Sequence, residues 1–104
     1  MYRVSVVYGA PDDPQAFDDY YERVHIPLAS KIPGLTRWTL TRADRTDGPL
    51  PDAYLIADLY AESRDALTAA LASPEGRAAA DDVAVFATGG ATMVFGDEVE
   101  VSLP

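Results

Sequence analysis

Two kinds of apolar periodicity alternate along this chain of 104 residues. Segments in which every second residue is apolar indicate half-buried strands, whereas apolar residues spaced three and four apart indicate amphipathic helices. The two periods follow one another in the order strand, helix, strand, strand, helix, strand. This order constrains the fold strongly, because in so short a chain both helices must cover one small sheet.

Four segments have the strand pattern and are rich in β-branched and aromatic residues, as strands usually are. The predicted strands are Tyr2–Tyr8, Leu35–Arg42, Ala53–Tyr60 and Ala91–Phe95. The segment Ala43–Asp52 contains several Gly, Pro and Asp residues and predicts a loop between the second and third strands.

The first helix is predicted from Pro14 to about Ser30, with Asp13 as its N-cap. Pro27 lies inside this helix and removes one backbone hydrogen bond, which predicts a kink or a break near His25. The apolar stripe of the helix consists of Phe17, Tyr21, Val24 and Leu28.

The second helical region carries two start signals. Ser63 is a plausible N-cap, and Ser73 followed by Pro74 repeats the signal ten residues later. We therefore expect two helices that meet at Ser73, the second of which runs to about Phe86 and ends before Gly89-Gly90.

The predicted fold class is α+β, a ferredoxin-like β-α-β-β-α-β split unit with both helices on one face of a four-stranded antiparallel sheet. The other face is rich in Val, Leu and Thr, so we expect a second copy to cover it and form a homodimer, a dimeric α/β barrel. Residues 1–96 form this domain. The tail at 97–104 alternates Val99, Val101 and Leu103 and is a candidate extra strand that could cross to the partner subunit.

Composition argues against several classes of function. The net charge is −9 and no Lys/Arg cluster is present, which disfavours nucleic acid and anionic membranes as partners. With one His and no Cys, and with acidic pairs that do not converge, we expect no metal and no cofactor. No signal-peptide pattern and no apolar run of about 20 residues is present, so we expect a cytoplasmic protein.

His25 is the only histidine in the sequence, and it lies four residues after Tyr21 on the same side of the predicted helix. An imidazole gains and loses protons near neutral pH, so His25 is a candidate general acid–base. The alternative is a structural histidine that donates to the backbone carbonyl left free at Arg23 by Pro27.

Aromatic side chains are candidates for the lining of a cavity between sheet and helices, or alternatively for plain core. Asp58 falls on the same strand face as Tyr54 and is a candidate partner of His25 or of a ligand; otherwise it is solvated or pairs with Arg37 or Arg42. The aromatic candidates are Tyr8, Tyr21, Trp38, Tyr54, Tyr60 and Phe86.

Several short segments resemble the EthD family. The His-x-Pro-Leu element that begins at His25 is the most specific part of the resemblance, which extends over residues 2–96 and leaves the tail outside. The matching segments are Tyr20–Leu28 followed by Pro33-Gly34-Leu35, Tyr54–Tyr60, and Ala72–Gly76 with Phe86–Gly90.

The resemblance implies a ferredoxin-like dimeric α/β barrel in a superfamily that includes cofactor-free monooxygenases, polyketide cyclases and muconolactone isomerases. In those enzymes a His and phenolic or other polar groups act on an activated C–H bond in a pocket between sheet and helices. Only His25 carries over by motif, since the second histidine of the isomerases is absent here.

Two functions remain open. The leading hypothesis is a cofactor-independent enzyme, of isomerase, cyclase or monooxygenase type, that acts on a cyclic or aromatic keto or lactone compound. His25 would be its acid–base and Tyr21 a catalytic neighbour. The substrate would be bound by Tyr8, Trp38, Tyr54, Asp58 and Phe86. The alternative is a non-catalytic dimeric protein that binds a hydrophobic metabolite or assists an oxygenase or catabolic pathway.

Overall fold

A computed structural model describes residues 1–44 and 53–104 of the chain. The elements follow the predicted order, with the first helical region divided into three parts. They are β1 (Tyr2–Tyr8), α1 (Pro14–Tyr20), η1 (Tyr21–His25), α2 (Ile26–Ala29), β2 (Arg37–Arg42), β3 (Leu55–Ala61), α3 (Arg64–Ala72), α4 (Pro74–Phe86) and β4 (Ala91–Asp97). The predicted loop at 43–52 falls mostly on residues 45–52, which lie outside the described residues.

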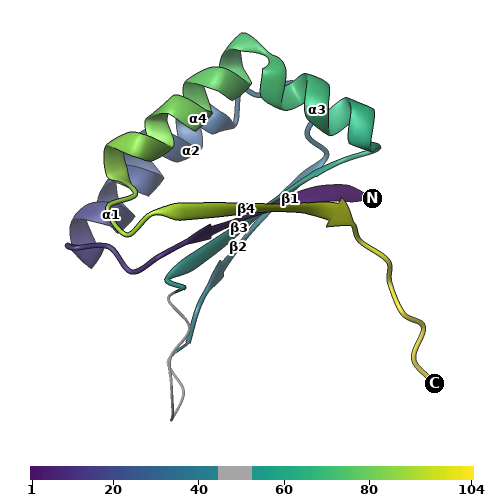
Figure 1. Ribbon diagram of the computed structural model, residues 1–104, viewed down its shortest axis with the longest axis horizontal. Helices are drawn as coiled ribbons and strands as arrows, with labels where there is room; N and C mark the ends of the chain where they lie inside the picture. Colours follow the sequence, from purple (N-terminus) through teal and green to yellow (C-terminus); the bar gives the residue numbers. More distant parts are fainter. Residues whose placement is uncertain (45–52) are drawn as a thin grey trace.

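The four strands form one antiparallel sheet in the order β2-β3-β1-β4. The register places Val4 of β1 opposite Leu59 of β3 and Phe95 of β4. All helices lie over one face of this sheet, and the other face is left open (Figure 1). This is the predicted ferredoxin-like arrangement, and it places β1 and β3 in the centre.

The first helical region changes its winding at Tyr21. Asp13 caps α1 by accepting a hydrogen bond from the N–H of Ala16 at 3.1 Å. From Tyr21 to His25 the winding is π-helical, and the N–H of Ile26 donates to the carbonyl of Tyr21, five residues back. The distortion predicted near Pro27 is therefore present, in the form of a wider turn. Proline has no N–H to donate to the preceding turn, so widening that turn costs little backbone hydrogen bonding.

The second helical region consists of two helices that meet at Ser73, as predicted. The Ser73 hydroxyl oxygen accepts from the N–H of Gly76 at 3.0 Å and so caps α4. Gly76 lies against the end of α3, where an added Cβ would come within 2.4 Å of the Ala70 carbonyl oxygen. Only glycine permits this close approach of the two helices.

The core lies between the helices and the sheet face that they cover. Alternation along the two central strands sends one set of side chains toward the helices. The largest fully buried side chains of the core are Tyr8 and Val4 of β1, Leu55 of β3 and Leu67 of α3.

The tail after β4 leaves the sheet on the side away from the helices (Figure 1). Residues 98–104 have no helix or strand, and Val99, Val101 and Leu103 are exposed. The extra strand is not formed within a single chain, and its crossing to a partner subunit stays a prediction. Among the described residues, no helix combines the length and the apolar character needed to cross a membrane.

Candidate functional site

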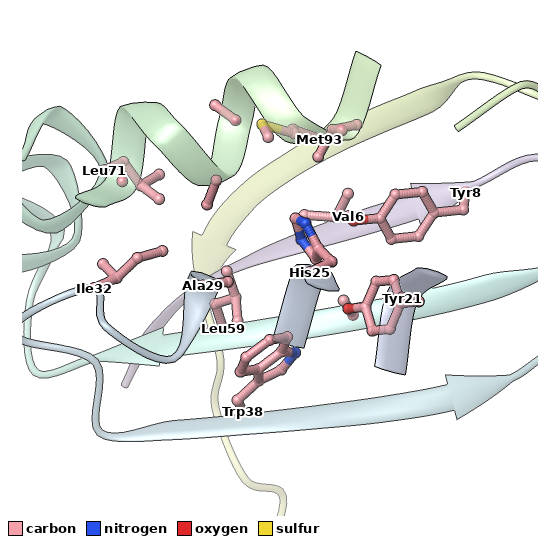
Figure 2. Close-up of a pocket in the computed structure, with 15 residues that line it drawn as sticks. Val6, Tyr8, Tyr21, His25, Ala29, Ile32, Trp38, Leu59, Leu71 and Met93 are labelled. Carbon is pink, nitrogen blue, oxygen red and sulfur yellow. The ribbon is translucent and has the colours of Figure 1, made fainter. Parts of the chain in front are cut away.

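A pocket lies between the sheet and the helices, and the empty space within it and in its open mouth amounts to about 420 Å³. Its wall is mostly apolar and is built from β1, β2, β3, the first helical region and α4, with Met93 of β4 at the edge. Four side chains with polar tips are set into this wall (Figure 2): Tyr8, Tyr21, His25 and Trp38.

His25 lies at the end of η1, where its ring is only 5% exposed. Its Nδ1 atom is 3.0 Å from the Oδ2 atom of Asp82 on α4. No described residue forms a hydrogen bond with its Nε2 atom. His25 therefore pairs with a carboxylate, and not with the Arg23 carbonyl that was the structural alternative from the sequence.

Asp82 is shared between two side chains. Its Oδ1 atom accepts a hydrogen bond from the Tyr20 hydroxyl at 2.5 Å, while Oδ2 meets His25. A carboxylate only accepts, so Nδ1 of His25 carries the proton in this contact and Nε2 presents a lone pair. The pair thus orients the imidazole with its basic nitrogen away from Asp82.

Burial controls the protonation of the site. It lowers the pKa of His25 below its ordinary value, because the charged imidazolium loses its hydration, and Asp82 offsets only part of that effect. Burial also raises the pKa of Tyr21 to about 12 and raises that of Tyr8. At neutral pH the site therefore holds a neutral imidazole and two protonated phenols.

Two buried donors in the pocket have no partner. The hydroxyl of Tyr21 and the Nε1 atom of Trp38 form no hydrogen bond with the described residues. Trp38 and Tyr8 counteract part of the rise in the pKa of Tyr21, yet neither meets its hydroxyl with hydrogen-bond geometry. Figure 2 shows the Tyr21 hydroxyl and the indole nitrogen of Trp38 turned toward the same region, next to His25.

Two other candidate residues, Phe86 and Tyr54, do not line the pocket. The Phe86 ring packs against the His25 ring, with 4.8 Å between the ring centres, and supports it from α4. The hydroxyl of Tyr54 donates to the Asp18 carboxylate at 2.9 Å, and the Tyr54 ring packs against the Phe17 ring. This hydroxyl already has a hydrogen-bond partner outside the pocket.

Asp58 does not reach the pocket. Alternation along β3 sends it to the open face of the sheet, where it forms an ion pair with Arg3 at 3.1 Å and accepts a hydrogen bond from Ser5. Neither of the arginines considered from the sequence is its partner. Arg37 lies over the Tyr60 ring, and Arg42 pairs with Asp18.

The sequence reasoning missed Asp82, because it treated the Asp81/Asp82 pair as ordinary surface charge. A usable signal was present. Asp82 follows Ala79 by three residues and precedes Phe86 by four, which places it on the buried stripe of α4. A carboxylate in such a stripe needs a partner. Within the described residues, no group of three or more acidic or histidine side chains is arranged to hold a metal ion.

Comparison with known proteins adds a family and a fold. Residues 11–90 match the EthD domain. An uncharacterised 11.0 kDa protein of the thcB–thcC intergenic region in Rhodococcus erythropolis is 51% identical over 104 residues, the full length of both chains.

Two solved structures are similar. An ethyl tert-butyl ether D (EthD) family protein from Bacillus halodurans C-125 is 33% identical, with a TM-score of 0.88 over 95% of this chain and 99% of that chain. SnoaB, a cofactor-independent oxygenase from Streptomyces nogalater, is 23% identical, with a TM-score of 0.61 over 99% of this chain and 95% of that chain, and shares the fold.

Proposed function

The chain belongs to the EthD family, and from this premise we propose that it is a cofactor-independent acid–base enzyme for a small cyclic or aromatic keto or lactone compound. One observation carries the proposal. A buried imidazole on the pocket wall is held at Nδ1 by Asp82, and its Nε2 atom has no partner among the described residues.

His25 is prepared to act as a base. Its lowered pKa keeps it neutral at pH 7, and the nearby carboxylate of Asp82 stabilises the imidazolium that forms when Nε2 takes a proton. A positioned base of this kind contributes about 10²–10⁴-fold to a rate. Asp82 is a positioning residue, because it touches the imidazole and not the substrate.

The apolar wall selects the kind of substrate. A ring system buries its hydrocarbon surface against aliphatic and aromatic side chains, and a carbonyl acidifies the neighbouring C–H bond. Returning the proton to another atom gives an isomerase reaction. Attack of the carbanion on a second carbonyl carbon of the same molecule, whose C=O π electrons move to oxygen and take up the proton, gives a cyclase reaction, and addition of dioxygen to the carbanion gives the monooxygenase type. SnoaB, which has the same fold, is a cofactor-independent oxygenase, and this supports the last type.

The open sheet face supports assembly as a homodimer, and a cytoplasmic location is part of the same proposal. Val94 is 53% exposed on this face, and the apolar side chains of the tail are unpaired. A second copy would cover both. The pocket lies between the sheet and the helices, on the other side of the sheet, so His25 does not need the second copy to form its contacts.

The test compares the wild type with His25→Ala on a panel of lactones and anthrone-type ketones. We expect the variant to lose about 10²–10⁴-fold in rate. Val85→Ala, a change at an exposed position of α4, is the control that should keep full activity. Equal turnover by His25→Ala and the wild type would exclude His25 as the base. Binding without turnover in the wild type would favour the second candidate, a non-catalytic binding or accessory protein.

A further inference from the structure

We infer that Tyr21 and Trp38 form a paired donor site for a neutral carbonyl oxygen. The substrate class of this pocket is then an enolisable ketone, and not a carboxylate or a phosphate ester. The inference deepens the proposed function and rests on it for the role of His25. It names the atoms that bind the reacting oxygen.

The first step concerns the two unpaired donors. The Tyr21 side chain is 4% exposed, and its hydroxyl has no hydrogen-bond partner among the described residues. The indole N–H of Trp38 is buried and unpaired as well, and an indole can only donate. Buried donors are seldom left without an acceptor in native proteins. The acceptor must therefore come from outside these residues.

The second step concerns the acceptors that the surrounding side chains offer to these two donors. The carboxylate of Asp82 is already engaged by His25 and Tyr20. Tyr8 also lines the pocket, but its hydroxyl does not meet that of Tyr21 with hydrogen-bond geometry, and the rest of the wall is mostly aliphatic, with Ala57 and Leu59 contributed by β3. A ligand that places one oxygen between Tyr21 and Trp38 would satisfy both donors, and its hydrocarbon part would contact the apolar wall.

The third step concerns the charge of that oxygen. No Lys or Arg side chain lines the pocket in the described part of the chain, and the protein carries a net charge of −9. An anionic carboxylate or phosphate would be buried there without a counter-charge, which is costly. A ketone is neutral when it binds and develops negative charge only as it reacts, so it suits two neutral donors.

The chemistry then follows without any added reagent. Nε2 of His25 takes a proton from the carbon next to the carbonyl, and the electron pair of the broken C–H bond moves toward oxygen to form an enolate. Tyr21 and Trp38 donate to that oxygen, and both remain protonated throughout. The rings are suitably close, since the Tyr21 ring centre is 5.0 Å from that of His25 and 6.5 Å from that of Trp38.

The experiment uses two probes of the same shape, 1-indanone and indane, which differ in the carbonyl oxygen. Dissociation constants are measured by NMR titration for the wild type, Tyr21→Phe and Trp38→Phe. We expect the wild type to bind indanone more tightly than indane. In each variant the ratio of the two dissociation constants should fall by up to about tenfold, while the affinity for indane is unchanged. Val85→Ala is the control and should retain the wild-type preference.

Two results would overturn the inference. One is equal affinity of the wild type for the two probes, or no binding of indanone, which means that the donors hold water. The other is an unchanged preference in both variants. Thermal unfolding without ligand adds a second readout: Tyr21→Phe should unfold at the same temperature as the wild type or a higher one, because it removes an unpaired hydroxyl.

The same data separate this inference from the proposed function. His25→Ala should lower turnover by about 10²–10⁴-fold and keep the preference for indanone. If the wild type shows the preference but no turnover of any ketone, the acid–base function fails and the donor site stands. If turnover depends on His25 while Tyr21→Phe and Trp38→Phe change neither preference nor rate, the donor site fails and the function stands.

Discussion

The Nδ1 atom of His25 and the Oδ2 atom of Asp82 lie 3.0 Å apart, although 57 residues separate them in the sequence. The contact joins the end of the π-helical turn to the middle of α4. It therefore depends on the packing of two helical regions over the sheet. This contact decides both the orientation of the imidazole and its proton affinity, and it can be tested in isolation.

Replacing Asp82 by asparagine should lower the pKa of His25 further, because the carboxylate is the group that raises it against the effect of burial. The histidine is unique in the chain, so one imidazole signal in an NMR titration measures the shift. The variant should also lose about 1–2 kcal/mol of unfolding free energy, since hydrogen bonds to a charged group contribute about 1.5–3 kcal/mol and the amide retains part of this.

Asp81→Asn is the matched control, because Asp81 is exposed on the neighbouring position of α4. It should leave the pKa of His25 nearly unchanged. If the two variants gave the same titration curve, the contact between Asp82 and His25 would not exist in solution.

Much of this fold could be predicted from the sequence, because the signals act over short distances. Ser73 followed by Pro74 predicted where α3 ends and α4 begins, and Pro27 predicted a distortion of the first helical region. Both effects arise within one or two helical turns. The aromatic candidates Tyr8 and Trp38 lie on the sheet face that meets the helices, and their role in binding a substrate stays a prediction.

The contacts of the site could not be predicted in the same way. Alternation shows that Asp58 and Leu59 lie on opposite faces of β3, but both faces of this strand carry apolar residues, so the pattern does not say which face the helices cover. The helices cover the face of Leu59, and Asp58 on the opposite face forms an ion pair with Arg3. Predicting the partner of His25 would have required the position of α4 over η1, which is a long-range property of the packing.

Acid should destabilise the protein partly through His25. Its pKa in the folded protein is lowered by burial, whereas an unfolded histidine titrates near 6.5. Below that pH the unfolded chain binds the proton more readily, so stability is retained above about pH 6.5 and is lost as the pH falls toward the lowered pKa of the folded state. Urea unfolding between pH 8 and pH 5 measures the slope.

Carboxylates also titrate as the pH falls, so the comparison requires a variant without the imidazole. His25→Gln should show a shallower loss of stability between pH 7 and pH 5 than the wild type. Parallel curves for the two proteins would mean that His25 has its ordinary pKa in the fold.

The close approach of α3 and α4 at Gly76 should be intolerant of a side chain. An alanine Cβ there would meet the Ala70 carbonyl oxygen at 2.4 Å, which forces the helices apart and costs about 1–3 kcal/mol of unfolding free energy. Because Gly76 also lines the pocket, binding of 1-indanone should weaken in the same variant. Gly96→Ala is the control, since no atom lies within 4 Å of its added Cβ, and it should unfold at the wild-type urea concentration.

The open face of the sheet should mediate self-association. Val94 is 53% exposed there, so Val94→Asp would place a charge in an interface between two copies and should change the mass in light scattering from that of two chains to that of one. Val85→Asp introduces the same charge on an exposed position of α4 and should leave the dimer intact.

Truncation after Glu98 removes the exposed apolar tail and keeps the contacts of Glu98 with Arg3 and Tyr60. This truncation should weaken the dimer if the tail crosses to the partner subunit. A wild-type mass of one chain at all concentrations would rule out the dimer and leave the pocket, which a single chain forms, unaffected.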